Sequence, residues 1–206
     1  MMRSQFPKTV KTHTVATIMA ACLLAGAPAH SDSLISMDGM MMKLAVENND
    51  AAAQYFIGRN YLVGKSVHVN KAEAAKWFSK AAKQAHKKAQ YELARLYLTG
   101  DGVEKNTIFA FDLMMGAARQ DHIAAQYELG KMYLQGVSGF SNANKALEWL
   151  NKAVESNHTS AMYTLGKLYY EGKIVNRKRN TGLKLLKEAN NQGSKEARKY
   201  LSALDY

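Results

Sequence analysis

The sequence predicts an all-α fold, an α-solenoid built from about four helix-turn-helix repeats of 36 residues. Three residue types recur at this period. They are the alanines Ala53, Ala89, Ala125, Ala161 and Ala197, the tyrosines Tyr61, Tyr97, Tyr133 and Tyr169, and the glycines Gly64, Gly100, Gly136 and Gly172. A fixed period of this length is typical of a stacked array, in which each unit buries its apolar face against its neighbours.

The first helix of a repeat is illustrated by residues 89–98, whose apolar residues at 89, 93, 96 and 97 follow helical spacing. Gly100 is expected to end this helix, because glycine tolerates the positive φ of a helix C-terminus. The second helices are predicted to begin at the capping residues Asn70, Asn106 and Asn142. Glu73, three residues beyond the first of these, suggests a capping box. In the fourth repeat Lys178 stands where the capping residue is expected.

The second helix carries one apolar stripe, which in the second repeat comprises Ala110, Leu113, Met114, Ala117 and Ala118. The second helices are predicted to end at Ala85, Asp121, Asn157 and Gly193, and three of these four residue types favour a left-handed turn. Small residues at positions 58, 94, 130 and 166 are expected to let the two helices of each pair approach closely.

Two single helices are expected to close the array. Residues 34–48 resemble a lone second helix and residues 194–204 a lone first helix, which gives ten helices in all. The predicted organisation is a signal peptide at 1–29, an N-terminal capping helix within 30–52, repeats at 53–88, 89–124, 125–160 and 161–196, and a C-terminal capping helix within 197–206.

The first 29 residues have the pattern of an export signal. A basic start precedes the apolar run 15–25, which is too short to span a membrane, and Ala27-Pro28-Ala29 provides the small residues of a cleavage site. Cleavage is expected after Ala29, with Ser31 as an alternative. The segment 19–22 also resembles a lipoprotein box, which would leave Cys22 lipidated. The expected location is the periplasm, and the alternatives are lipid anchoring at Cys22 or secretion.

The composition limits the classes of partner. The only cysteine and both prolines lie in the predicted leader, so the exported chain must be held together by packing alone. Loss of the leader lowers the formal net charge from +11 to +8, because Arg3, Lys8 and Lys11 leave with it. This charge suggests anionic neighbours such as acidic protein faces, anionic glycans or lipid head groups. A nucleic acid is not an expected partner of an exported protein, and no transmembrane span is predicted.

The repeat resembles the Sel1-like repeat, a relative of the tetratricopeptide repeat, over about residues 50–205. The segments that carry this resemblance are 100–103 (GDGV), 129–133 (LGKMY) and 145–149 (KALEW). The resemblance implies a right-handed superhelix that acts as an adaptor between proteins, with its first helices on the inner surface. Exported bacterial members are similar to factors in host-cell entry, exopolysaccharide export, periplasmic signal regulation and flagellar stator assembly. Cysteine-rich relatives are associated with β-lactam binding or hydrolysis, and this chain lacks the cysteines of their repeats.

Two basic features are candidate partner-binding sites. The first, here called the basic column, is one cation per repeat on the first helices: Arg59, Arg95, Lys131 and Lys167. Repeats two and three place Glu92 and Glu128 three residues earlier, so that a row of ordinary surface ion pairs is an alternative interpretation; repeats one and four have no acid there. The second, the basic cluster, is Arg177, Lys178 and Arg179, where positive charge at a helix N-terminus opposes the helix dipole.

No catalytic or cofactor site is predicted. Three histidines, His86, His122 and His158, stand one period apart, but stacked repeats hold equivalent positions about 10 Å apart, too far to share one metal ion. They are therefore expected to be polar turn residues. A second set of tyrosines, Tyr55, Tyr91, Tyr127 and Tyr163, is expected to pack against its neighbours, with ligand stacking as the alternative.

The sequence thus predicts a non-enzymatic, exported adaptor that binds a protein of the cell envelope. Two alternatives remain open at this stage. The first is a binder of an anionic envelope polymer such as lipopolysaccharide, exopolysaccharide or peptidoglycan, and the second is a hydrolase of β-lactams or peptidoglycan.

Overall fold

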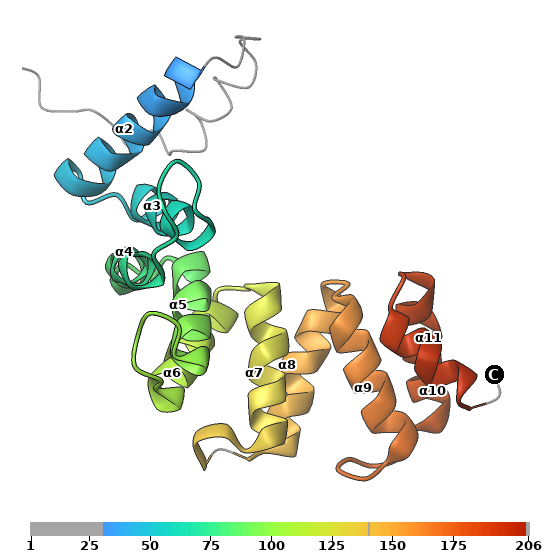
Figure 1. The fold of residues 1–206 in the computed structure, drawn as a ribbon. Coiled ribbons are helices and arrows are strands. Elements are labelled where there is room, and N and C mark those ends of the chain that lie inside the picture. The colour runs from blue at the N-terminus through green and yellow to red at the C-terminus, as the bar shows by residue number, and fades with distance from the viewer. Residues whose placement is uncertain (1–30, 140, 205–206) are drawn as a thin grey trace, which may run out of the picture.

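The computed structural model describes residues 31–139 and 141–204. These residues form ten α-helices and one short 3-10 helix, and no strand is found among them. The predicted leader, including Cys22 and the expected cleavage site, lies outside the described residues. The helices follow one another along a curved path, with α2 at one end and α11 at the other (Figure 1).

The helix order is that of a regular array. It comprises α2 (Ser31–Glu47), α3 (Ala51–Val63), α4 (Lys71–Lys83), α5 (Lys87–Thr99), α6 (Thr107–Arg119), α7 (Ile123–Gln135), η1 (Val137–Gly139), α8 (Ala143–Glu155), α9 (Thr159–Glu171), α10 (Arg179–Asn191) and α11 (Lys195–Ser202). The first helices α3, α5, α7 and α9 and the second helices α4, α6, α8 and α10 are each 13 residues long. The described helices include no segment long and apolar enough to cross a membrane.

Asparagine starts three of the second helices, as predicted. The Oδ1 atoms of Asn70, Asn106 and Asn142 accept backbone N–H bonds at 3.0, 2.9 and 2.9 Å. The predicted capping box at Asn70 is wrong in one respect, because the Glu73 side chain does not accept a bond from the Asn70 N–H. The Asn70 N–H donates to the Tyr61 carbonyl at 2.9 Å, and the Glu73 carboxylate pairs with Lys76 Nζ at 2.6 Å. In the described part of the chain Lys178, before α10, makes no capping bond through its side chain.

The predicted ends of the second helices are confirmed by the backbone. Ala85, Asp121, Asn157 and Gly193 have φ angles of 58, 56, 59 and 89°. Asn49, one period before Ala85, has a φ of 52°. The segment α2 therefore has the position of a second helix, and α11 that of a first helix; the helices that would complete their repeats are not among residues 31–139 and 141–204.

Close helix pairing within a repeat depends on the small residues of the first helices. A Cβ atom added to Gly58 would lie 2.7 Å from the Phe78 ring, and one added to Gly130 would lie 2.8 Å from Leu150 Cγ. The large partners on the second helices are fully buried: Phe78, Met114, Leu150 and Leu186 are each 0% exposed. This confirms the expected role of the small residues, and dense packing of this kind stabilises the array without disulfides.

Side-chain amides also join the start of the first helix to the end of the second helix within a repeat. Gln84 Nε2 donates to Gln54 Oε1 at 2.9 Å, and the equivalent glutamines one period later are joined at 2.8 Å. Ser156 occupies the next position in this series, and among the described residues no donor reaches the buried Oε1 atom of Gln126. The row of amide pairs is therefore interrupted at the third repeat.

Candidate functional site

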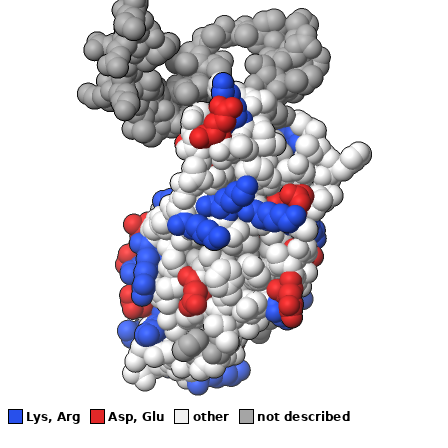
Figure 2. Space-filling model, turned by 90° about the vertical axis from the view of Figure 1, so that its left-hand side faces the viewer, with Lys and Arg blue, Asp and Glu red and all other residues white. Residues whose placement is uncertain are grey.

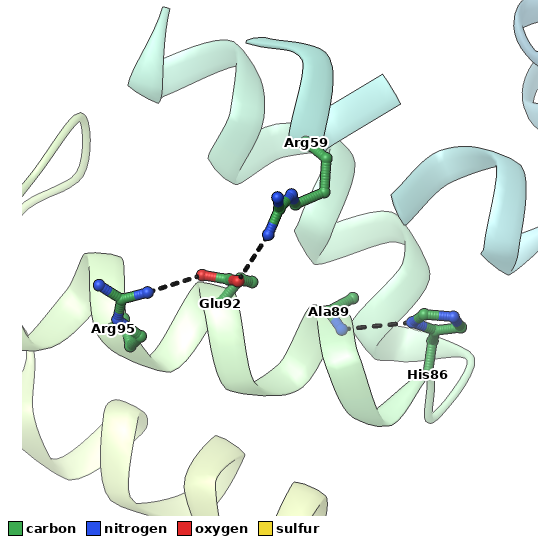
Figure 3. A network of polar contacts seen from close by, with 5 residues as sticks. All are labelled: Arg59, His86, Ala89, Glu92 and Arg95. Atoms are coloured by element: carbon green, nitrogen blue, oxygen red, sulfur yellow. Dashed lines mark hydrogen bonds and ion pairs between the residues drawn. The ribbon is translucent and has the colours of Figure 1, made fainter. Parts of the chain in front are cut away.

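The N-terminal half of the basic column is organised around one buried carboxylate. Glu92 on α5 is only 10% exposed and lies between Arg59 of the preceding repeat and Arg95 of its own helix (Figure 3). The Arg59 Nη1 atom is 3.4 Å from Glu92 Oε1, and Arg95 Nη1 is 3.2 Å from Glu92 Oε2. A single acid thus links two repeats and holds two guanidinium groups in place.

Lys131 has its own carboxylate on the same helix. Its Nζ atom donates to Glu128 Oε1 at 3.2 Å and to Oε2 at 2.9 Å. Partial burial alone would lower the pKa of Lys131, but the hydrogen bonds and charge of Glu128 outweigh burial and raise it. Lys131 is therefore charged at any physiological pH.

The last cation of the column belongs to a denser group. Lys167 Nζ lies 3.8 Å from Glu171 Oε1, which also accepts a bond from the Tyr200 hydroxyl at 3.0 Å. Lys173 Nζ is 3.4 Å from Glu171 Oε2. Burial, aided by the neighbouring Glu171 carboxylate, raises the pKa of Tyr200 to about 12. Burial would raise the pKa of Glu171, but the bonds from Tyr200 and the two lysines lower it.

All four cations of the basic column therefore have a carboxylate partner. The sequence pattern indicates such partners only for Arg95 and Lys131, and this expectation is incomplete. Arg59 pairs with Glu92 of the next repeat, and Lys167 pairs with Glu171, which lies one helical turn later on the same helix. The column is a row of ion pairs of mixed sign, with N–O distances from 2.9 to 3.8 Å.

Aromatic rings lie beside these ion pairs. Tyr91 stacks on His122 with ring centroids 4.6 Å apart, and the Arg95 guanidinium lies 5.8 Å from the Tyr91 centroid. The same tyrosine–histidine contact recurs in the pairs Tyr55–His86 and Tyr127–His158, at 5.0 and 4.8 Å. Tyr163 instead meets Tyr200, edge to face, at 6.3 Å. These tyrosines are half-buried, and their packing role is confirmed.

The three histidines are helix caps, a role that the sequence analysis missed. Their Nδ1 atoms accept the backbone N–H of Ala89, Ala125 and Ala161, each at 3.2 Å. Burial lowers the pKa of all three, which favours the neutral form that can accept a bond. The signal was present in the sequence, because the good capping residues Asp50 and Ser194 stand in the same repeat position.

The basic cluster packs on two tyrosines of α9. Arg177 Nε donates to the Tyr170 carbonyl at 3.2 Å, and Arg179 Nη2 donates to the Tyr170 hydroxyl at 2.7 Å. Lys178 Nζ lies 5.3 Å from the centre of the Tyr169 ring. The cluster is thus ordered by contacts within the chain, while its three residues remain exposed.

Charges of both signs are interspersed on the molecular surface. On the face that forms the left-hand side of Figure 1, lysine and arginine side chains lie in groups with aspartate and glutamate close by (Figure 2). Over residues 31–139 and 141–204, no group of three or more histidine, aspartate or glutamate side chains could hold a metal ion.

Comparison with known proteins identifies the repeat. The family model described as Sel1 repeat matches four consecutive segments, at residues 51–86, 87–122, 123–158 and 159–194. The chain belongs to the Sel1-repeat family. Sel1 repeats generally mediate interactions between proteins, and the fold is typically a non-catalytic scaffold. A search of curated proteins gave no significant match.

Solved structures share the fold. A protective antigen of uropathogenic Escherichia coli with an SLR fold is 29% identical and has a TM-score of 0.77; the match covers 81% of this chain and 36% of the antigen. A Sel1-repeat protein from Oxalobacter formigenes is 30% identical, with a TM-score of 0.75; the match covers 81% of this chain and 67% of the Oxalobacter protein. An immunity protein from Pseudomonas aeruginosa is 31% identical, with a TM-score of 0.50; the match covers 71% of this chain and 55% of the immunity protein. This chain therefore spans about a third of the antigen's length.

Proposed function

We propose that this chain is an exported Sel1-repeat scaffold that binds a partner protein of the bacterial cell envelope through the surface of its first helices. The main support is the composition of that surface. Tyrosine and arginine are the residue types most often found at the energetic centre of protein interfaces; tyrosine recurs on this surface in every repeat and arginine in the first two. They are held in fixed positions by ion pairs and ring contacts, so little side-chain freedom is lost on binding.

The ion pairs favour a protein over an anionic polymer as the ligand of this surface. Glu92, Glu128 and Glu171 lie between 2.9 and 3.8 Å from the cations of the basic column. A polyanion would have to compete with each of these carboxylates. A protein segment with charges of both signs can pair with the cations and the acids together.

Site-specific photo-cross-linking in intact cells tests this proposal. A photoreactive residue in place of Arg95 is expected to give adducts with one defined protein. The matched control replaces Asp112, which is exposed on the second helix α6, and is expected to give none. The proposal is wrong if neither position yields a protein adduct while the purified chain is retained on acidic polysaccharide in a salt-sensitive manner.

Export is supported by the pattern of residues 1–29 and is tested separately. Fractionation of the producing cells, followed by sequencing of the N-terminus, is expected to find the chain in the periplasm and beginning at His30. A chain that begins at a lipid-modified Cys22 would replace this proposal with an anchored form. A chain that keeps its first residues and stays in the cytoplasm would overturn it.

A further inference from the structure

The third repeat holds a buried hydrogen-bond acceptor that has no donor. Gln126, near the start of α7, is only 3% exposed, and in the described part of the chain nothing donates to its Oε1 atom. Buried polar atoms are nearly always paired, because an unpaired one has given up its bonds to water without a replacement. The equivalent atoms of Gln54 and Gln90 accept bonds from Gln84 and Gln120, at 2.9 and 2.8 Å. The third repeat therefore has a vacant donor position.

The first repeat shows what occupies this position. There Gln84, at the end of α4, places its Nε2 atom among three oxygen atoms. The distances are 2.9 Å to Gln54 Oε1, 2.9 Å to the Asn49 carbonyl and 3.5 Å to Asn49 Oδ1. The donor arrives from the surface, since Gln84 is itself exposed. A nitrogen that carries more than one N–H group thus fits between these oxygens.

The third repeat keeps the acceptors and makes one of them negatively charged. Asp121 stands two periods after Asn49 and has nearly the same φ, 56° against 52°. Gln126 Nε2 donates to Asp121 Oδ1 at 3.3 Å and to a carbonyl in the last turn of α6. In the same way Gln54 Nε2 donates to Asn49 Oδ1 at 2.7 Å and to a carbonyl in the last turn of α2. Because the amide nitrogen is held alike, Gln126 Oε1 faces the end of its own second helix, as Gln54 Oε1 does.

The donor itself is absent from the third repeat. Ser156, at the end of α8, stands where Gln84 stands in the first repeat, and its side chain is shorter. Ser156 and Asp121 are both exposed, so a donor from another molecule can approach from the surface, as the Gln84 side chain does. Over residues 31–139 and 141–204, Asp121 forms no ion pair with a lysine or arginine. The carboxylate is thus available to a cation.

We propose that Asp121 and Gln126 form a binding site for a primary ammonium group, supplied by a lysine side chain of the partner protein. An ammonium group carries three N–H donors, which match the Asp121 carboxylate, the Asp121 carbonyl and Gln126 Oε1. The carboxylate favours a cation over the neutral amide that the first repeat uses. The ends of α6 and α8, beside Asp121 and Ser156, add the negative ends of two helix dipoles. That the lysine belongs to the partner rests on the proposed function, whereas the site itself does not.

A lysine of the chain itself already binds at this edge. Lys87, at the start of α5, donates from Nζ to the Gln120 carbonyl at 3.0 Å, one residue before Asp121. The end of α6 thus accepts an ammonium group, but Lys87 leaves the proposed site unfilled, because Gln126 Oε1 has no donor among the described residues. Its charge repels an incoming lysine, and the side chains around the buried Oε1 atom must shift to admit a donor. Binding of a single ammonium group is therefore expected to be weak.

NMR spectroscopy of the isotope-labelled chain tests the site directly. The probe is Nα-acetyl-lysine N-methylamide, which presents a lysine side chain without other charges, and the signal followed is the side-chain amide of Gln126. A saturable shift with a dissociation constant of about 10 mM is expected, since a lone ion pair at the surface is weak. The trimethyl-lysine analogue carries the same charge but no N–H group on its side chain, and it is expected to give no such shift.

Substitutions separate this site from general attraction between charges. Ser156→Gln is expected to abolish binding of the probe, because the chain's own amide then occupies the site as in the first two repeats. Ser160→Gln is the matched control, since Ser160 is also exposed but lies on α9, and it is expected to bind the probe like the unaltered chain. Asp121→Asn gives the neutral acceptor of the first repeat and is expected to weaken binding about fivefold. Helical circular dichroism establishes that the variants are folded.

The site is refuted if Gln126 shows no saturable shift with the lysine probe, or if the trimethyl analogue shifts it equally. It is also refuted if Ser156→Gln binds the probe as the unaltered chain does. Each of these results would mean that the unpaired oxygen takes no ammonium group.

The source of the ammonium group is tested separately. Carbodiimide coupling of the complex captured through Arg95 is expected to join the Asp121 carboxylate to a lysine of the captured protein. Spermidine, a free amine, is expected to bind no more tightly than the lysine probe. Absence of the coupled lysine, or much tighter binding of spermidine, would refute the partner as the source. If no protein is captured through Arg95, the proposed function fails while the NMR result on the site stands.

Discussion

Replacing the three capping histidines by asparagine is expected to remove most of the acid sensitivity of the fold. The Nδ1 atoms of His86, His122 and His158 each accept a backbone N–H bond at 3.2 Å. An imidazole can do this only when it is neutral, because both nitrogens of the protonated ring are donors. Asparagine makes the same type of cap without a titrating group, and it already starts three of the second helices.

The direction of the pH dependence follows from the lowered pKa values. Burial is the main cause that lowers the pKa of each histidine in the folded chain, while an unfolded histidine titrates near about 6.5. Just below that pH the unfolded chain binds more protons than the folded one, so acid favours unfolding. The stabilisation is complete above the unfolded pKa and is lost as the pH falls from there through the lower, folded values.

The magnitude follows from the number of caps. A helix N-cap contributes about 1 kcal/mol, so protonation of all three histidines is expected to cost about 3 kcal/mol. This is a substantial part of the roughly 5 to 15 kcal/mol by which ordinary domains are stable. Thermal and urea unfolding at pH 7.5 and pH 5.0, followed by circular dichroism and tryptophan fluorescence together, measures the loss and tests whether unfolding is two-state.

The quantity to compare is the change in the free energy of unfolding between the two pH values. Absolute stabilities are not compared, because asparagine also removes the contacts with the tyrosine rings at every pH. The triple Asn variant is expected to lose much less unfolding free energy between pH 7.5 and pH 5.0 than the unaltered chain. His68→Asn, in an exposed loop, is the matched control, and it is expected to lose as much unfolding free energy on acidification as the unaltered chain. If the triple variant loses as much stability on acidification as the unaltered chain, the capping argument is refuted.

Two further substitutions test close packing and the interrupted row of amide pairs. Gly102→Ala is expected to destabilise by about 2 to 4 kcal/mol, because a Cβ atom there would lie 2.5 Å from the Ala72 nitrogen. Gly139→Ala, with a similar φ of 79° but open surroundings, should cost only about 1 kcal/mol, and equal losses in urea unfolding would contradict the packing argument. Ser156→Gln is expected to stabilise by about 1 kcal/mol by donating to the unpaired Oε1 of Gln126; an unchanged or lower melting temperature would show that the donor does not reach it.

The helical array could be predicted almost completely, because its boundaries depend on local chemistry. Asn106 accepts a bond from a backbone N–H three residues away, and Asp121 takes a left-handed turn within its own dihedral angles. Such features depend only on residues that are close in the sequence. They recur at the same positions of successive 36-residue repeats, which makes a chance occurrence very improbable. The capping histidines were missed because histidine is not among the preferred capping residues, although Asp50 and Ser194 marked the position.

The partners of the basic column could be predicted only where they are local. Glu128 stands three residues before Lys131, and helical spacing alone brings the two together. The contact between Arg59 and Glu92 crosses 33 positions and depends on how two repeats stack. Helix periodicity says which face a residue occupies but not which residue of the next repeat it meets.

The missing amide pair at Ser156 has a mechanical consequence for the array. A chain of units in contact only with their neighbours opens first at its weakest junction. In the first two repeats a glutamine pair joins the start of the first helix to the end of the second, and in the fourth repeat the bond from Thr159 to Gln192 does the same. The third repeat lacks this bond between its two helices, so it is expected to open more easily than the first two repeats and to let the array bend there.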